Sequence, residues 1–181
     1  LRNNTYTNVM AVWVLQRALE ALAELPPHYR QQLVEELTLR DEELDRWRDI
    51  TRKMKVVFHA DGVLTQFEGY EQLLDFDWEG YRERYGNIQR LDRVLEAEGD
   101  STDRYKLAKQ ADVLMLLFLL SRQELRELLA GLGYQVSEEQ LARTVSYHLE
   151  RTSHGSTLSG VVSAWVLARY EFPGKGFVDA L

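Results

Sequence analysis

A loop rich in glycine and hydroxyl side chains is the stretch of this sequence best suited to bind an anion. Residues 152–159 read Thr-Ser-His-Gly-Ser-Thr-Leu-Ser and precede an apolar helical segment. Glycine lets backbone N–H groups approach an anion closely, and the following helix directs its positive end toward the loop. Ser156, Thr157 and Ser159 offer hydroxyl donors, and His154 adds a donor or a charge. A cluster of helix caps beside a solvated histidine explains the same residues, and on residue types alone it is the more common arrangement.

Two polar residues, Lys109 and Gln110, stand directly before the most apolar segment of the chain, residues 111–120. Both side chains can donate to sugar hydroxyls or to a phosphate. An ordinary exposed helix start, with Asp112 near the positive end of the helix dipole, explains the same residues equally well. The residues by themselves leave both interpretations open.

A third stretch, Gln66-Phe67-Glu68-Gly69-Tyr70, combines groups that suit a sugar. As the end of a strand, it places Gln66 and Glu68 on one face and Phe67 on the other. Aromatic faces stack on sugar rings, while amide and carboxylate groups bind sugar hydroxyls. A strand end with a solvated Glu68 is the alternative interpretation.

Composition and spacing exclude several other kinds of chemistry. The net charge of −7 argues against broad nucleic-acid binding, which needs a basic face. There is no cysteine, so disulfides and thiol nucleophiles are excluded. No P-loop, dinucleotide fingerprint or Gly-x-Ser-x-Gly motif occurs. We predict no metal site, because four scattered histidines lack ligand spacing with one another or with a carboxylate. They are His28, His59, His148 and His154.

The signals that begin and end helices are clear in several places. Pro26 lies after the first periodic segment and ends it, because proline lacks the backbone N–H. Ser121 with Glu124, and Ser137 with Gln140, have the spacing of capping boxes. We therefore expect separate helices after each of these serines.

Hydrophobic periodicity predicts an all-α chain with one short β-hairpin around Asp61-Gly62. The 181 residues suffice for one domain with a core, and the apolar run 111–120 is half of the roughly 20 residues that a bilayer span needs. We expect no membrane span. Over residues 68–103 we expect short helices with long connections. The predicted helices cover 6–24, 27–37, 41–54, 106–120, 122–131, 138–150 and 157–170, and the hairpin joins 55–58 to 63–67.

Four motifs, taken in order, resemble those of glycoside hydrolase family 65, which contains maltose, trehalose, kojibiose and nigerose phosphorylases. Together they extend over nearly the whole chain, which makes them far more specific than any one alone. They are Asn3-Asn4-Thr5-Tyr6-Thr7-Asn8-Val9-Met10-Ala11, Asp61-Gly62-Val63 followed by 66–70, Lys109-Gln110-Ala111-Asp112-Val113, and 152–159.

The resemblance implies that residues 1–181 are the C-terminal portion of an (α/α)6-barrel catalytic domain. An N-terminal β-sandwich, the first half of the barrel and a C-terminal β domain would lie outside these residues. The implied reaction is inverting phosphorolysis of an α-linked glucosyl disaccharide to β-glucose 1-phosphate and glucose, in the cytoplasm. Inorganic phosphate is then a co-substrate, and no cofactor is expected. The expected macromolecular partner is the remainder of the same polypeptide, or a homo-oligomer.

The resemblance also assigns residues. It implies phosphate binding by His154, Gly155, Ser156 and Thr157, and glucose binding by Lys109 and Gln110. Weaker candidates for pocket walls are Tyr6, Asn8 and Glu68.

The sequence departs from the family pattern near its first residues. The family's general acid, a glutamate, would lie upstream of Leu1, and Arg2 stands where an acidic residue is usual. We therefore expect residues 1–181 alone to be inactive. A family 65 α-glucoside hydrolase and a non-catalytic helical interaction module are the alternatives.

Overall fold

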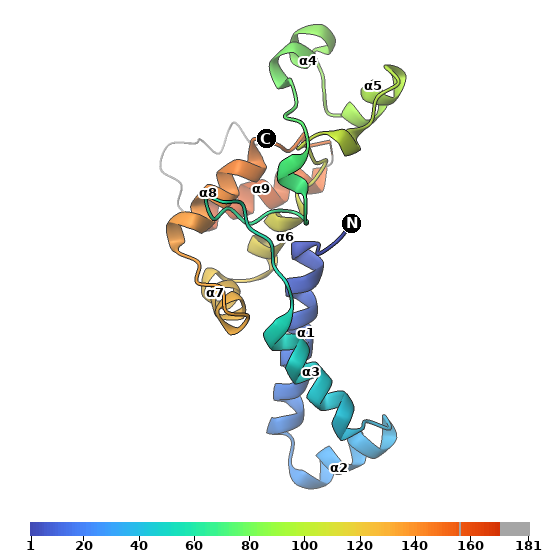
Figure 1. The fold of residues 1–181 in the computed structure, drawn as a ribbon, viewed down its shortest axis with the longest axis vertical. Coiled ribbons are helices and arrows are strands. Elements are labelled where there is room, and N and C mark those ends of the chain that lie inside the picture. Colours follow the sequence, from blue (N-terminus) through green and yellow to red (C-terminus); the bar gives the residue numbers. More distant parts are fainter. Residues whose placement is uncertain (156, 171–181) are drawn as a thin grey trace.

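The computed structural model of the chain describes residues 1–155 and 157–170. Within them the protein is built from nine α-helices joined by connections that range from two residues to long irregular segments (Figure 1). The predicted all-α class is confirmed. The helices are α1 (Thr5–Glu24), α2 (Pro27–Glu36), α3 (Asp41–Lys53), α4 (Trp78–Tyr85), α5 (Leu91–Ala97), α6 (Asp112–Leu119), α7 (Arg122–Gly131), α8 (Glu138–Leu149) and α9 (Thr157–Tyr170), with short 3-10 turns at Tyr70–Gln72 and Thr102–Arg104.

The hydrophobic core forms around α6, which contacts α1, α7, α8 and α9. Four of its eight residues are buried, among them Leu116 and Leu117. Val9 and Val12 of α1 face the same core, as do residues from α7, α8 and α9. Burying one leucine side chain contributes about 2 kcal/mol, so the buried leucines of α6 stabilise this core strongly. The α6 segment is therefore a core helix, as its composition predicts.

Away from this core, the C-terminal part of α1 extends with α2 and α3 as an arm (Figure 1). Every residue of α2 is at least partly exposed, and α3 buries only Thr51. At the other end of the molecule, α4 and α5 form a second excursion with a small cluster of Phe76, Ile88, Leu91 and Leu95. None of the described helices combines the length and the apolar character that crossing a bilayer requires.

Both predicted capping boxes are present. The Ser121 hydroxyl accepts a hydrogen bond from the Glu124 N–H, and the Glu124 carboxylate accepts one from the Ser121 N–H. Ser137 and Gln140 make the same reciprocal pair at the start of α8. These local signals begin α7 and α8 where the sequence predicts.

The predicted hairpin is reduced to a tight turn with one antiparallel bridge, between Phe58 and Leu64. His59 N–H donates to the Val63 carbonyl at 2.8 Å. Gly62 has a φ of +85°, a conformation that favours glycine, so this residue permits the turn.

One predicted boundary is wrong. The helix expected from 106 begins only at Asp112. Residues 105 and 108 instead form parallel bridges to Leu74 and Thr152. Backbone hydrogen bonds to distant segments replace the helical ones. Hydrophobic periodicity reports only on neighbouring residues, so it could not predict this pairing.

His148 of α8 ties the core to this turn and makes the fold sensitive to acid. It is 1% exposed, and its Nε2 lies 2.7 Å from the Leu64 carbonyl oxygen, so Nε2 carries the proton. Burial lowers the pKa of His148 from 6.5 to about 4. Between these values the unfolded chain binds a proton that the folded chain does not, so stability falls as the pH falls.

We predict that lowering the pH from 6.5 to 4 removes about 3 kcal/mol through this group. Urea denaturation at several pH values measures the loss. The variant His148→Gln keeps an N–H donor toward Leu64 but does not titrate, so its stability should change less between pH 6.5 and 4.5. Equal pH dependence of the variant and the parent protein would contradict this assignment.

Candidate functional site

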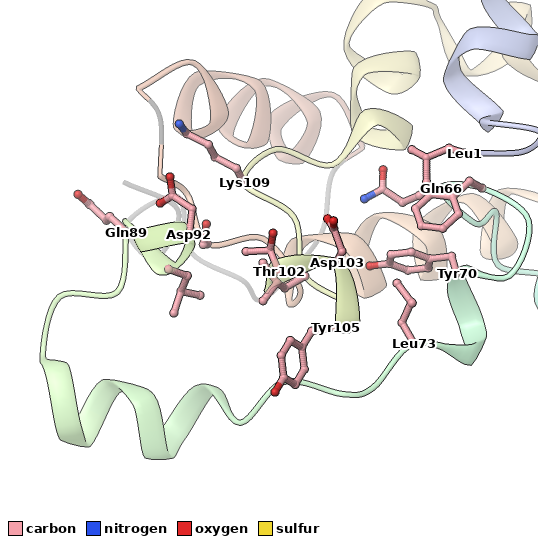
Figure 2. Close-up of a pocket in the computed structure, with 14 residues that line it drawn as sticks. Leu1, Gln66, Tyr70, Leu73, Gln89, Asp92, Thr102, Asp103, Tyr105 and Lys109 are labelled. Atoms are coloured by element: carbon pink, nitrogen blue, oxygen red, sulfur yellow. The ribbon is translucent and has the colours of Figure 1, made fainter. Parts of the chain in front are cut away.

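A pocket of about 510 Å³ opens beside the N-terminal segment, between α5 and the 3-10 turn at Tyr70–Gln72 (Figure 2). Several chain segments that are distant in sequence contribute its walls. The lining residues are Leu1, Gln66, Phe67, Tyr70, Leu73, Gln89, Leu91, Asp92, Thr102, Asp103, Tyr105, Leu107, Lys109 and Ser153.

The segment over residues 104–108 joins the two sides of the site through backbone hydrogen bonds. The Lys106 N–H donates to the Leu74 carbonyl at 2.7 Å. Farther along, the Ala108 N–H donates to the Arg151 carbonyl, and the Ala108 carbonyl accepts from the Ser153 N–H, both at 2.9 Å. Lys109 is thereby placed next to the glycine and hydroxyl-rich loop, although more than forty positions separate the two motifs.

The described part of that loop is held from both ends. The Thr152 hydroxyl donates to the His148 carbonyl at 2.7 Å, which fixes the loop to α8. At Gly155, an added Cβ would lie 2.2 Å from the Gln89 carbonyl oxygen and 3.4 Å from Lys109 Cγ. Only glycine fits this approach, so the loop packs directly against the segment before α5.

His154 has a left-handed backbone with a φ of +50°, and its Nδ1 lies 3.2 Å from the Ser159 hydroxyl. Burial lowers the pKa of His154 below its ordinary value. The ring is therefore neutral at pH 7 and acts through hydrogen bonds rather than through charge. Thr157 is exposed at the first position of α9, and Ser156 lies outside the described residues.

One wall of the pocket carries an ion pair between Arg90 and Asp92. Arg90 donates to both oxygens of Asp92, at 3.1 and 2.9 Å. This bidentate hydrogen bond lowers the pKa of Asp92 to about 2, and the Lys109 charge contributes to the shift. Asp92 therefore remains ionised at any pH at which the protein would be assayed, and Arg90 fixes its orientation.

The N-terminal motif is bonded to the Gln66–Glu68 stretch. The Thr5 N–H donates to the Gln66 carbonyl at 2.9 Å, and the Glu68 N–H donates to the Arg2 carbonyl at 3.0 Å. The Gln66 side-chain oxygen accepts a hydrogen bond from the Asp112 N–H at 2.8 Å. Gln66 thus connects the start of α1 to the start of α6.

The structure places the three candidates for pocket walls, Tyr6, Asn8 and Glu68, outside the pocket lining. Glu68 binds Asn3 and forms an ion pair with Lys55. The Asn8 amide donates to the Lys55 carbonyl at 2.7 Å, and Tyr6 packs against the main core.

The predicted partner of Lys109 is also turned away from the pocket. The Nε2 of Gln110 lies 2.8 Å from Met115 Sδ, and Gln110 does not line the cavity. Of the predicted sugar-binding side chains, the structure brings only Lys109 to the pocket, beside the 152–155 loop. The sugar-binding roles of the others stay predictions.

Sequence reasoning missed several polar side chains of the pocket, namely Tyr70, Asp92, Thr102, Asp103 and Ser153. Four of these, Tyr70, Asp92, Thr102 and Asp103, lie in the 68–103 stretch, where periodicity gives little information. Tyr70 and Ser153 belong to recognised motifs, and this was the available signal.

Comparisons with known proteins agree on one family. The family model for the glycosyl hydrolase family 65 central catalytic domain matches residues 1–173. An uncharacterized glycosyl hydrolase of Mycobacterium tuberculosis is 62% identical over 167 residues, which cover 92% of this chain and 12% of the relative. The trehalose 6-phosphate phosphorylase of Lactococcus lactis is 35% identical over 164 residues, covering 91% of this chain and 20% of the relative.

A solved structure gives the same fold. A human-microbiome protein provisionally named a kojibiose phosphorylase aligns with a TM-score of 0.66 over 93% of this chain and 21% of its own. At 24% identity this likeness establishes the fold alone. The chain therefore spans between about an eighth and a fifth of the proteins that it resembles.

We predict that Gly155→Ala destabilises the protein by about 1–3 kcal/mol, because the new Cβ overlaps the Gln89 carbonyl oxygen. Thermal unfolding measures the effect. Gly131→Ala is the matched control, since its Cβ would meet only the end of Gln16 at 3.7 Å. Alanine favours helix over glycine, so the control should be neutral or slightly stabilised. Equal losses in both variants would show that the loop does not pack as described.

Proposed function

This chain belongs to glycosyl hydrolase family 65, and we propose that it is part of an inverting disaccharide phosphorylase. The substrates would be an α-linked glucosyl disaccharide and inorganic phosphate, and the products β-glucose 1-phosphate and glucose. Inorganic phosphate is a co-substrate in this proposal, and no further cofactor is required. Relatives named as phosphorylases of trehalose 6-phosphate, kojibiose and maltose support this reaction class.

One observation carries the proposal: the parallel pairing of Ala108 with Thr152 brings Lys109 beside the 152–155 loop, and Lys109 and Ser153 line a single pocket, whereas His154 and Gly155 lie next to its lining. These two motifs are the ones that residue chemistry suggests for an anion and for sugar hydroxyls. The approach of Gly155 to the Gln89 carbonyl holds the loop against the same pocket. Sugar and phosphate could therefore meet at this point.

In the proposed reaction, a phosphate oxygen forms a bond to the anomeric carbon while the bond to the glycosidic oxygen breaks. A carboxylic acid protonates the departing oxygen, and the configuration at carbon inverts. Phosphate takes the place of the activated water, so a second carboxylate is not needed. We assign the phosphate to His154, Gly155, Ser156 and Thr157, and the adjoining glucose to Lys109, with Gln110 as a further candidate.

We assign Glu68 and Asn8 positioning roles. Glu68 binds Asn3, and both Glu68 and Asn8 hold Lys55. Family resemblance puts the general acid shortly before Asn3 in the chain. Contacts that fix this segment would orient the acid, and Tyr6 would support it by packing at the start of α1.

We also propose that residues 1–181 are the C-terminal portion of the catalytic barrel and require the rest of the polypeptide, or a second copy, to act. The chain alone would lack the acid and would not turn over substrate. These proposals are tested with the full-length polypeptide that carries these residues.

A second candidate, an α-glucoside hydrolase of the same family, is favoured by one observation. Asp103 lines the pocket, and among the described residues its carboxylate has no hydrogen-bond or ion-pair partner. An inverting hydrolase needs such a carboxylate as a base to activate water. Glucose release without phosphate that disappears in Asp103→Asn would favour the hydrolase.

The reaction class is tested by incubating the full-length protein with α-linked diglucosides, with and without inorganic phosphate. We expect β-glucose 1-phosphate, identified by its anomeric proton resonance, only when phosphate is present. Free glucose formed at the same rate without phosphate would overturn the phosphorylase proposal.

Lys109→Ala in the full-length protein should lower kcat/KM for the disaccharide about 10- to 100-fold, the effect of losing one charge-assisted hydrogen bond. Steady-state kinetics with saturating phosphate measures it. Lys53→Ala is the control, because Lys53 lies on α3 in an exposed pair with Asp49. Wild-type kinetics for Lys109→Ala would remove this residue from the substrate site.

A further inference from the structure

We propose that Tyr70 is a sugar-binding residue whose hydroxyl forms a hydrogen bond with an uncharged hydroxyl group of the substrate. This inference rests on the proposed function and adds a ligand contact to it. It also predicts that this end of the pocket binds a neutral polyol in preference to a phosphoryl group.

The first observation is an unsatisfied hydroxyl. Tyr70 is 2% exposed, and its buried hydroxyl makes no hydrogen bond of acceptable geometry among the described residues, although the Gln66 side chain is near enough to act on its pKa. Leaving a buried polar group unpaired costs about 1–3 kcal/mol, so native proteins rarely do so without a reason. Tyr70 lines the pocket, and Figure 2 shows its hydroxyl directed toward the part of the cavity where Thr102 and Asp103 lie.

The second observation is that the ring is fixed in place. Gly69, with a φ of +90°, turns the chain into the 3-10 turn that begins with Tyr70. The ring packs edge-on against Phe67, with 5.3 Å between centroids, and lies 6.1 Å from the His148 ring. Burial raises the pKa of Tyr70 above its ordinary value, so the hydroxyl keeps its proton. A fixed, protonated donor is preorganised for a ligand oxygen.

The third observation is the charge of the pocket. Among the described lining residues, Lys109 is the single cation, Asp92 is paired with Arg90, and the carboxylate of Asp103 has no hydrogen-bond or ion-pair partner. Outside the lining, Arg151 and Asp75 act on the Tyr70 hydroxyl with opposite charges. The carboxylate of Asp103 would accept a hydrogen bond from a sugar hydroxyl and would repel a phosphoryl group. A sugar hydroxyl can accept from Tyr70 and donate to Asp103.

Tyr81 provides a matched control outside the pocket lining. Its hydroxyl already donates to Glu98 Oε2 at 2.5 Å, so it has a structural partner. Replacing tyrosine by phenylalanine removes one hydroxyl at each site and preserves the ring. The two variants therefore distinguish a hydroxyl whose partner is the ligand from a hydroxyl whose partner is another residue of the protein.

The experiment compares Tyr70→Phe and Tyr81→Phe in the full-length protein. For Tyr70→Phe we expect kcat/KM for the disaccharide to fall about tenfold, the KM for inorganic phosphate to stay unchanged, and the Tm to stay equal or rise. For Tyr81→Phe we expect a lower Tm with kcat/KM for the disaccharide nearly unchanged. Wild-type kinetics of Tyr70→Phe, or a lowered Tm, would overturn the proposal.

Failure of the proposed function can be distinguished from failure of this inference. Absence of phosphate-dependent turnover in the wild-type protein would reject the phosphorylase, and glucose titration by calorimetry would still test Tyr70. Weaker glucose binding by Tyr70→Phe than by the wild type supports the contact. Equal affinity, or no glucose binding by the wild type, overturns it.

Discussion

The start of α6 is the junction on which the candidate site depends. A helix leaves its first backbone N–H groups without internal partners, and Ala111, at the N-cap position, has no side chain that could accept from them. The Gln66 side chain accepts from the Asp112 N–H instead, and the Asn4 amide donates to the Asp112 carboxylate at 3.1 Å. A long-range cap thus replaces a local one. Three motifs that are far apart in sequence must come together for α6 to begin where it does.

The same helix explains why the polar groups gather at one end. Its middle is buried against α1, α7, α8 and α9, and its last residue is the exposed Leu119, so the polar groups gather at its start. The core fixes the backbone from which Gln66 and Lys109 project. Such rigidity matters for a binding site, because side chains on a well-packed framework lose little freedom when a ligand arrives.

The excursion that contains α4 and α5 completes the pocket, although it buries few hydrophobic side chains of its own. Its own cluster is small, and the segment 104–108 connects it to the rest of the structure through hydrogen bonds to Leu74 and to Arg151. This arrangement delivers Asp92 and Asp103 to the cavity while Gly155 packs against Gln89. The pocket is therefore assembled largely from loops, and its chemistry can vary without changing the helical core.

The sequence by itself determined the features that depend on near neighbours. The helical class, both capping boxes, the break at Pro26 and the turn at Gly62 follow from local hydrogen bonding and backbone preference. The order of the motifs identified the family. Local chemistry also indicated Lys109 and the 152–155 loop as polar sites, but it could not show that they adjoin.

Tertiary structure decided which polar groups face the pocket. Backbone pairing of 105 and 108 with distant residues overrode the helix predicted from 106. Glu68, whose residue type suits a sugar, is instead engaged by Asn3 and Lys55. Tyr70 reaches the pocket because the turn at Gly69 and the packing of its ring direct it there. Side-chain direction depends on contacts between remote segments, and residue type and spacing do not encode those contacts.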